Sequence, residues 1–256
     1  SIYIIMSLTT DEKVHGFVPI ATFGKKIAGV VDNPMLKDGS TKIETNEKVP
    51  FRQAVNKDTE RSILYVTAPS GSGKSYYTRQ YIEDYHKAYP KRHVYVFSAL
   101  DSCATLDKLK YLKRIKIKEA KFLNMELNAI DFKESLCVFD DTDVISNKHI
   151  KLKVFTLLNS ILETGRHSKV SCVFTSHNAN MGLDTKRILN EAHSITIFPR
   201  NMGNRQLKYL LGEYLGFDKD EIKRIKKTNG RWVTICKSYP MTFFDQSTMF
   251  IKDMDD

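Results

Sequence analysis

The stretch Ala68-Pro69-Ser70-Gly71-Ser72-Gly73-Lys74-Ser75 follows directly on the apolar run 62–67 and opens the segment 74–89, which Pro90 ends. A glycine-rich turn between a buried strand and a helix presents backbone N–H groups and the positive end of the helix dipole to phosphates. In such a loop the lysine adds a full charge at the β- and γ-phosphates, and the last serine hydroxyl reaches Mg²⁺. The stretch therefore predicts a site for a nucleotide and Mg²⁺.

The first position of this loop departs from the usual pattern, because Ala68 stands where a glycine is common. Alanine has the smallest side chain after glycine, and an ordinary backbone conformation suffices there, so we expect the loop to keep its shape. The residues expected to contact ATP are Ser70, Gly71, Ser72, Gly73, Lys74, Ser75 and Tyr76.

The composition is that of a folded, basic protein. Hydrophobic residues make up 41% of the 256 residues, and 40 Lys and Arg against 30 Asp and Glu leave a formal charge of +10. This excess favours a polyanionic partner such as nucleic acid, and the alternative is a basic surface that only keeps the chain soluble.

The cysteines and the hydropathy exclude several classes of protein. The four cysteines form no Cys-x-x-Cys pair, so they predict neither a zinc site nor a disulfide framework and suit a reducing compartment. No apolar run approaches the length of a membrane span, and the N-terminus has no signal-peptide pattern. We therefore expect a soluble intracellular protein.

Apolar runs alternate with amphipathic segments along the chain. The runs predict strands at 62–67, 92–98, 135–140, 170–175 and 194–198, and the intervening patterns predict helices at 74–89, 107–121 and 148–164. Beyond residue 200 we expect helical segments at 205–215 and 218–227 and a strand-like run at 231–236. This order predicts an α/β fold with a mainly parallel central sheet flanked by helices.

The expected organisation has three parts. Residues 1–60 form an N-terminal extension of short strands and loops, residues 61–200 form the P-loop ATPase core, and residues 201–256 add helices and strands packed on the core. We expect the strand 170–175 to lie between the strand before the loop and the strand 135–140.

The second motif is Leu136-Cys137-Val138-Phe139-Asp140-Asp141, about 65 residues after the loop. A carboxylate at the end of a buried strand holds Mg²⁺ beside the loop serine in P-loop NTPases, which makes Asp140 and Ser75 the metal-binding candidates. Asp141 points to the other side and is expected to align or activate the attacking water. Two adjacent acids at this position favour hydrolysis over transfer to a bound acceptor.

Polar residues also follow the strand 170–175, where a side chain can sense the γ-phosphate and position water. His177 and Asn178 are equal candidates for this role, and a solvated loop position is the alternative for His177. Arg166 precedes the same strand after a helix and a glycine. It is either an arginine finger that reaches across a subunit boundary or a helix C-terminal arginine that interacts with the helix dipole.

Missing motifs narrow the class further. The sequence contains no Asn-Lys-x-Asp motif for guanine recognition and no Leu-Ser-Gly-Gly sequence of transporter-type ATPases. A GTPase and a transporter ATPase are therefore disfavoured.

Taken together, the motifs resemble those of viral genome-packaging ATPases of the FtsK–HerA division, most of all the poxvirus-type enzymes of large double-stranded DNA viruses. The resemblance covers residues 60–240 and rests on the loop 68–75, Val138-Phe139-Asp140-Asp141, Gly165-Arg166-His167 and the ending Arg231-Trp232-Val233-Thr234-Ile235 with Tyr239-Pro240. The chain departs from related pumps at 176–178, where glutamine is common.

The resemblance implies the fold of a RecA-like P-loop NTPase of the ASCE division. It also implies an ATPase that drives double-stranded DNA into a preformed capsid as a ring homo-oligomer, a pentamer or a hexamer. It implies Arg166 as the finger between subunits and Lys74 and Asp141 as catalytic residues of each site. It further implies a capsid or portal-vertex protein as partner, and a place at the virus assembly site in the host cytoplasm or in the virion.

The segment 108–121 is the strongest candidate for DNA contact. Basic residues that lie close together repel one another unless an anion is near, and such a segment suits a phosphate backbone without reading bases. An ordinary solvated helix face is the alternative. The candidates are Lys108, Lys110, Lys113, Arg114, Lys116 and Lys118, with Lys121 at the end of the segment.

Two other functions compete with a packaging motor. One is a different nucleic-acid ATPase, such as a helicase or an AAA+ protein, and the other is a P-loop kinase for a small molecule. A kinase would need no DNA and no ring, and the adjacent acids Asp140 and Asp141 would be unusual in it.

Overall fold

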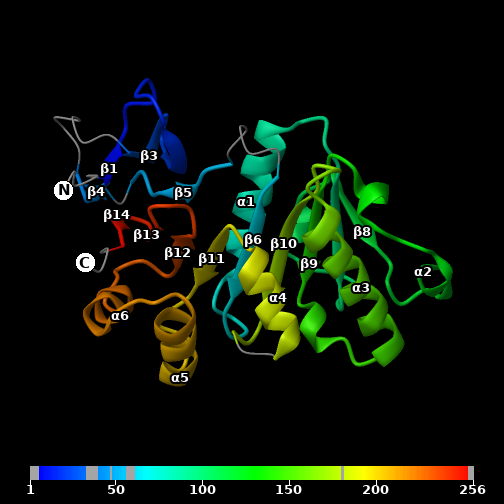
Figure 1. The fold of residues 1–256 in the computed structure, drawn as a ribbon. Coiled ribbons are helices and arrows are strands. Elements are labelled where there is room, and N and C mark those ends of the chain that lie inside the picture. Colours follow the sequence, from blue (N-terminus) through cyan, green and yellow to red (C-terminus); the bar gives the residue numbers. More distant parts are fainter. Residues whose placement is uncertain (1–5, 33–39, 47, 56–60, 180–181, 253–256) are drawn as a thin grey trace. The chain divides into compact units, whose positions relative to one another are not determined.

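The computed structural model describes residues 6–32, 40–46, 48–55, 61–179 and 182–252 (Figure 1). The chain divides into two compact units. Residues 57–193 form what we call the P-loop unit, and residues 1–56 together with 194–256 form the flanking unit. The glycine-rich loop and both adjacent acids lie in the P-loop unit.

The P-loop unit is built on parallel strands. Within its described residues the strands lie in the order β6 (Ile63–Thr67), β10 (Ser171–Ser176), β9 (Leu136–Asp140), β7 (Val94–Ser98) and β8 (Leu112–Ile115). Short 3₁₀ turns, η2 (Ala129–Phe132) and η3 (Thr142–Val144), flank β9. The predicted α/β fold is confirmed, and β10 lies between the loop strand β6 and the acid-bearing strand β9, as expected.

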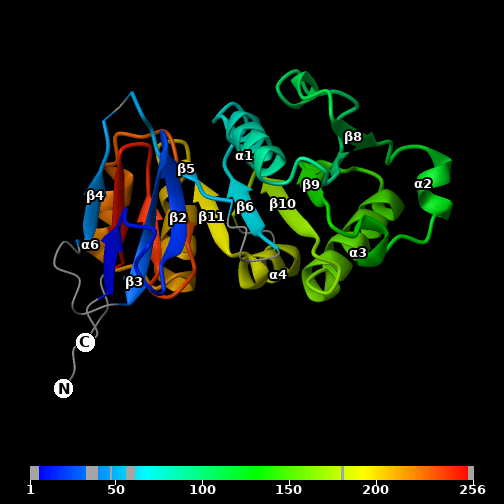
Figure 2. The ribbon, with the colours of Figure 1, turned by 90° about the horizontal axis from the view of Figure 1, so that it is seen from above.

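Helices cover both faces of these strands (Figure 2). α1 (Lys74–Ala88) lies on one face, and α3 (Lys148–Thr164) and α4 (Leu183–Glu191) lie on the other. α3 begins after Asn147, whose side chain accepts two backbone N–H groups of the first turn. At its other end the buried Arg61 guanidinium donates to the last carbonyl oxygens of the helix. Side chains thus satisfy backbone groups at both ends of α3.

The basic segment 107–121 is not one helix, so this prediction was wrong. It contains the end of the 3₁₀ turn η1 (Leu106–Lys108), then β8, and the start of the short helix α2 (Ala120–Asn124). β8 pairs in parallel with β7, and its backbone groups therefore find partners in the sheet. The helix propensity of lysine is a weak signal, and pairing with a neighbouring strand overrides it.

The flanking unit contains two antiparallel arrangements of strands. The first has the order β1 (Met6–Thr9), β3 (Lys26–Asp32), β2 (Val18–Phe23) and β5 (Arg52–Gln53). The second has the order β4 (Lys42–Glu44), β14 (Thr248–Ile251), β13 (Thr242–Phe244), β12 (Val233–Cys236) and β11 (Ser194–Ile197). N-terminal and C-terminal segments of the chain therefore build this unit together.

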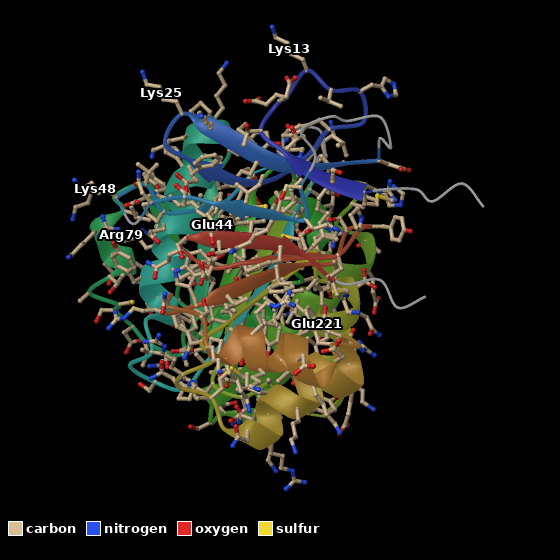
Figure 3. All side chains as sticks on the ribbon, turned by 90° about the vertical axis from the view of Figure 1, so that its left-hand side faces the viewer. Lys13, Lys25, Glu44, Lys48, Arg79 and Glu221 are labelled. Atoms are coloured by element: carbon tan, nitrogen blue, oxygen red, sulfur yellow. The ribbon has the colours of Figure 1, made fainter. Side chains whose placement is uncertain are left out.

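Figure 3 shows the flanking unit in three layers, with the first arrangement outermost, the second in the middle and helices beneath it. Lys13 and Lys25 project outward from the loops of the outer layer (Figure 3). The helical layer consists of α5 (Asn204–Leu207), which continues as the π-helix η4 (Lys208–Tyr214), and α6 (Lys219–Lys226). α6 begins with a capping box between Asp218 and Glu221.

Phe51 joins the two sequence halves of the flanking unit. Its side chain is completely buried, and its ring packs edge-on against Phe23 at 5.0 Å and against Phe244 at 6.3 Å between ring centroids. Phe23 is only half-buried. The three rings thus connect β2 with β13 through one buried residue.

We expect Phe51→Ala to destabilise the protein by about 3–5 kcal/mol, because it removes buried ring area and leaves a cavity. Phe23→Ala is the matched control and should cost clearly less, since its ring buries less area. Urea unfolding of both variants measures the difference. Equal losses of unfolding free energy would contradict the central place of Phe51.

Candidate active site

The loop after β6 has the backbone shape that its glycines permit. Gly71 and Gly73 have φ angles of 75° and 108°, which side-chain-bearing residues rarely adopt. Gly73 immediately precedes α1, whose first N–H groups have no intrahelical acceptor and so are available to an anion. The buried Ser72 hydroxyl has no hydrogen-bond partner within the part of the chain that the structure describes. A phosphate fits this loop.

Lys74 is folded back into the loop. Its ammonium group is buried, donates to the carbonyl oxygen of Ala68 at 2.8 Å and lies 3.7 Å from Oδ1 of Asp141. Ala68 contributes only its backbone oxygen to this contact and has no positive φ angle, so the position does not require a glycine. The structure therefore brings the predicted lysine and the second predicted acid together.

The adjacent acids at the end of β9 have different surroundings. Asp140 is buried, and both this burial and the negative charge of Asp141 raise the pKa of its carboxyl to about 6. Asp141 has a positive φ of 50°, so the chain turns sharply after Asp140. This turn directs the second carboxylate toward Lys74, as the distance above shows.

Thr175 is a site residue that the sequence did not single out. Its hydroxyl accepts the backbone N–H of Asp141 at 3.0 Å and lies 3.1 Å from Oδ1 of Asp140 and 3.3 Å from Oδ1 of Asp141. Thr175 thus stabilises the turn that separates the two carboxylates. The hint in the sequence was its place at the end of the strand 170–175, one residue before the polar tip.

The tip of β10 brings one of the two sensor candidates to the acids. Nδ1 of His177 lies 3.7 Å from Oδ1 of Asp141 and 3.5 Å from Oδ2 of Asp143. Asn178 is exposed, and its backbone oxygen accepts hydrogen bonds from Tyr65 and Ser176. Asp143 was not predicted, although it follows the acid pair by two residues.

Arg166 lies apart from these groups. It is exposed in the turn after α3, before β10 begins, whereas the loop, the acids and His177 follow the carboxyl ends of their strands. Because the strands are parallel, their two ends lie at opposite edges of the sheet. Arg166 therefore does not belong to the site of its own chain.

Three of the seven basic residues around β8 are paired with acids. Arg114 pairs with Asp107 at 2.6 Å, and this guanidinium lowers the pKa of the Asp107 carboxyl. Lys118 lies 3.0 Å from Asp101, and Lys116 lies 3.0 Å from Glu119. Lys108, Lys110, Lys113 and Lys121 are exposed. These side chains do not line one helix face, and their contact with DNA stays a prediction.

The residues proposed for Mg²⁺ suit that ion. Ser75 follows Lys74 on α1, and Asp140 ends β9, so the donors are a hydroxyl and a carboxylate oxygen, which Mg²⁺ prefers. The buried, electrostatically unfavourable Asp140 carboxylate would gain from a nearby cation.

These features define a protein with the fold and phosphate-binding loop of P-loop ATPases. Two solved structures support the fold. The conjugation coupling protein TcpA of pCW3 is 11% identical, covering 94% of this chain and 78% of its own, with a TM-score of 0.52. The cytoplasmic domain of the type VII secretion ATPase EccC of Thermomonospora curvata is 12% identical, covering 94% and 29%, with a TM-score of 0.50.

One curated protein is similar enough in sequence to place the chain in a family. Protein V3 of Sputnik virophage ("Uncharacterized protein V3") is 41% identical over 187 residues, which are 72% of this chain and 74% of the relative. The chain belongs to the family of this virophage protein. The viral relative agrees with the predicted resemblance to viral packaging ATPases.

The chain was also compared with a further solved structure and with protein-family models. The genome-packaging NTPase B204 of Sulfolobus turreted icosahedral virus 2 is 13% identical, covering 77% of this chain and 99% of its own, with a TM-score of 0.45. No protein-family model matches the chain. Among the residues that the structure describes, no helix is long and apolar enough to span a bilayer.

The raised pKa of Asp140 predicts a pH effect on stability. A carboxyl whose pKa rises from 3.8 to about 6 on folding binds more protons in the folded state, so its contribution to stability falls as the pH rises through this interval. A pKa difference of about two corresponds to a change of about 3 kcal/mol in the free energy of unfolding. Without Mg²⁺ and nucleotide, Asp140→Asn should therefore stabilise the protein at neutral pH, but not below about pH 4.

Urea unfolding of the wild type and the Asp140→Asn variant in EDTA, at both pH values, measures this effect. A difference between the two proteins that does not change with pH would contradict the assignment.

Proposed function

We propose that the protein is an ATP-hydrolysing translocase for double-stranded DNA that packages a viral genome into a preformed capsid. The observation that carries the proposal is the convergence of Lys74, Asp141 and His177 at the carboxyl ends of three adjacent parallel strands. This arrangement supports hydrolysis because it combines a phosphate-binding cation with a carboxylate that can act on water once the cation turns to the phosphates.

Each residue has a defined part in hydrolysis. Lys74 moves from the Ala68 carbonyl oxygen to the β- and γ-phosphates, and the loop N–H groups hold the remaining phosphate oxygens. Ser75 and Asp140 would hold Mg²⁺, and the ion would neutralise phosphate charge. Once Lys74 turns to the phosphates, the Asp141 carboxylate orients and activates the attacking water, and His177 lies beside it to sense the γ-phosphate.

A ring of subunits accounts for Arg166. Its exposure and its place at the sheet edge opposite the loop support a role as a finger, inserted into the site of a neighbouring subunit. There it would stabilise the charge of the transition state. This requires a homo-oligomer, for which we propose a pentameric or hexameric ring.

We place the DNA contacts on the exposed lysines around β8, which include Lys108, Lys110 and Lys113. A motor that moves along DNA needs contacts to phosphates and no reading of bases, which lysines provide. A capsid or portal-vertex protein is the further partner, and the site of action is the place of virus assembly or the virion. A helicase or another nucleic-acid-dependent ATPase is the second candidate, favoured by the same site.

The first test is ATP turnover of the purified protein with and without linear double-stranded DNA. We expect DNA to stimulate turnover, Lys74→Ala to abolish it together with ATP binding, and Asp141→Asn to lower kcat by about 100-fold or more with binding preserved. Lys87→Ala, an exposed lysine on the same helix, is the matched control and should behave as wild type. Turnover that survives Lys74→Ala would refute the site, and the absence of DNA stimulation would refute the motor.

The second test concerns Arg166. We expect Arg166→Ala to lose turnover by about 1000-fold while it still binds ATP. Mixing it with the Lys74→Ala protein should restore part of the activity, because intact loops then meet intact fingers of neighbouring subunits. Arg187→Ala is the control, an exposed arginine near the same end of α3, 3.7 Å from Glu163. Wild-type turnover of Arg166→Ala, or no recovery on mixing, would contradict the finger.

A further inference from the structure

The segment 176–178, which begins at the last residue of β10, is held in place from two sides. Ser176 is completely buried at the end of the strand, and its backbone oxygen accepts the N–H of Ala68 at 3.2 Å. The next residue, His177, is the one whose imidazole lies beside Asp141. The position of that imidazole therefore depends on what fixes this short segment.

Tyr65 holds the segment from within the sheet. Its side chain is completely buried in β6, and its hydroxyl lies 2.7 Å from the Ser176 hydroxyl and donates to the backbone oxygen of Asn178 at 3.1 Å. The Ser176 hydroxyl also reaches that oxygen at 2.9 Å and the hydroxyl of Thr67 at 3.2 Å. Burial raises the pKa of Tyr65 to about 12, so the hydroxyl keeps its proton and remains a donor at neutral pH.

Asp143 holds the segment from the opposite side. Its Oδ2 accepts the backbone N–H of His177 at 3.0 Å, and only 4% of its side chain is exposed. Its own backbone oxygen accepts the ammonium group of Lys151 at 3.1 Å, which ties the η3 turn to the first turns of α3. The backbone of Asp143 is thus anchored to α3, and its carboxylate contacts the His177 N–H from this position.

Asp143 and His177 each have one buried polar atom that makes no hydrogen bond to the residues that the structure describes. Oδ1 of Asp143 and Nδ1 of His177 are both buried and have no hydrogen-bond partner in the described part of the chain. Nδ1 lies 3.5 Å from Oδ2 of Asp143, slightly beyond a hydrogen bond. A small rotation of the imidazole would close this contact, as catalytic hydrogen bonds often tighten when substrate binds.

We propose that Tyr65 and Asp143 are positioning residues that act through His177, fixing the turn after β10 so that the imidazole lies between the Asp141 and Asp143 carboxylates. The proposal rests on the proposed function, because it takes His177 as the γ-phosphate sensor. The Tyr65 side chain is completely buried and only 4% of the Asp143 side chain is exposed, so we expect neither to contact the phosphates. Their loss should therefore lower kcat while the KM for ATP, which the loop 68–75 determines, stays the same.

The first experiment compares variants that remove one buried hydroxyl. Tyr65→Phe should lower kcat by about 10- to 100-fold with an unchanged KM, because a small misplacement of a catalytic group has effects of this size. Tyr81→Phe is the matched control, since Tyr81 is equally buried and donates to Ser62 at 3.0 Å, near the other end of β6. Both variants should lose similar stability, but only Tyr65→Phe should lose kcat.

The second experiment tests whether the residues act through His177. Asp143→Ala should lower kcat, and Asp143→Asn, which keeps an oxygen acceptor for the His177 N–H, should recover part of it. In the His177→Ala background neither Tyr65→Phe nor Asp143→Ala should lower kcat further. Full additivity of the losses would overturn the proposal, while the effect of Lys74→Ala on turnover tests the proposed function separately.

A third measurement does not depend on turnover. The ring ¹⁵N signals of His177, identified by their loss in His177→Ala, report the surroundings of the imidazole in solution. We expect these signals to shift in Tyr65→Phe and in Asp143→Ala and to stay in place in Tyr81→Phe. Signals that are the same in all these proteins would overturn the proposal even if the protein hydrolysed no ATP.

Discussion

The pairing of β10 between β6 and β9 is the constraint on which the site depends. Because these strands are parallel and in register, the loop after β6, the tip of β10 and the acids after β9 all follow carboxyl ends at one edge of the sheet. Segments about 65 and 100 residues apart in the sequence meet there. The hydroxyl of Thr175 then connects β10 with both acids, so the middle strand contributes chemistry as well as spacing.

The two adjacent acids have different electrostatic surroundings, which suit them to different roles. Burial makes Asp140 an unfavourable anion, which a cation would stabilise, whereas Asp141 already has the Lys74 ammonium beside it. The sharp turn at Asp141 is what gives neighbouring residues such different partners. His177 and Asp143 add two further polar groups next to Asp141.

Much of this could be predicted because the signals were local. In the loop 68–75 and in the run 136–141, apolar residues give way to residues that can bind phosphate or a metal ion, and this change marks the end of a strand. Both strand ends lie where the sequence predicted them. The helix at 148–164 was equally clear from its apolar spacing. The prediction of a helix at 107–121 was wrong because the charges of this segment indicated a solvated helix. In the structure, part of the segment pairs with β7.

The sequence by itself determined the class of protein, since strand ends, glycines and acids are encoded by short contiguous runs. The tertiary structure alone decided which polar residues work together. Thr175, Asp143 and Tyr65 have ordinary side chains whose importance comes from partners 34, 34 and 111 residues away. It also decided between His177 and Asn178 as the neighbour of Asp141, because the hydrogen bonds that set the turn after β10 come from other strands and turns.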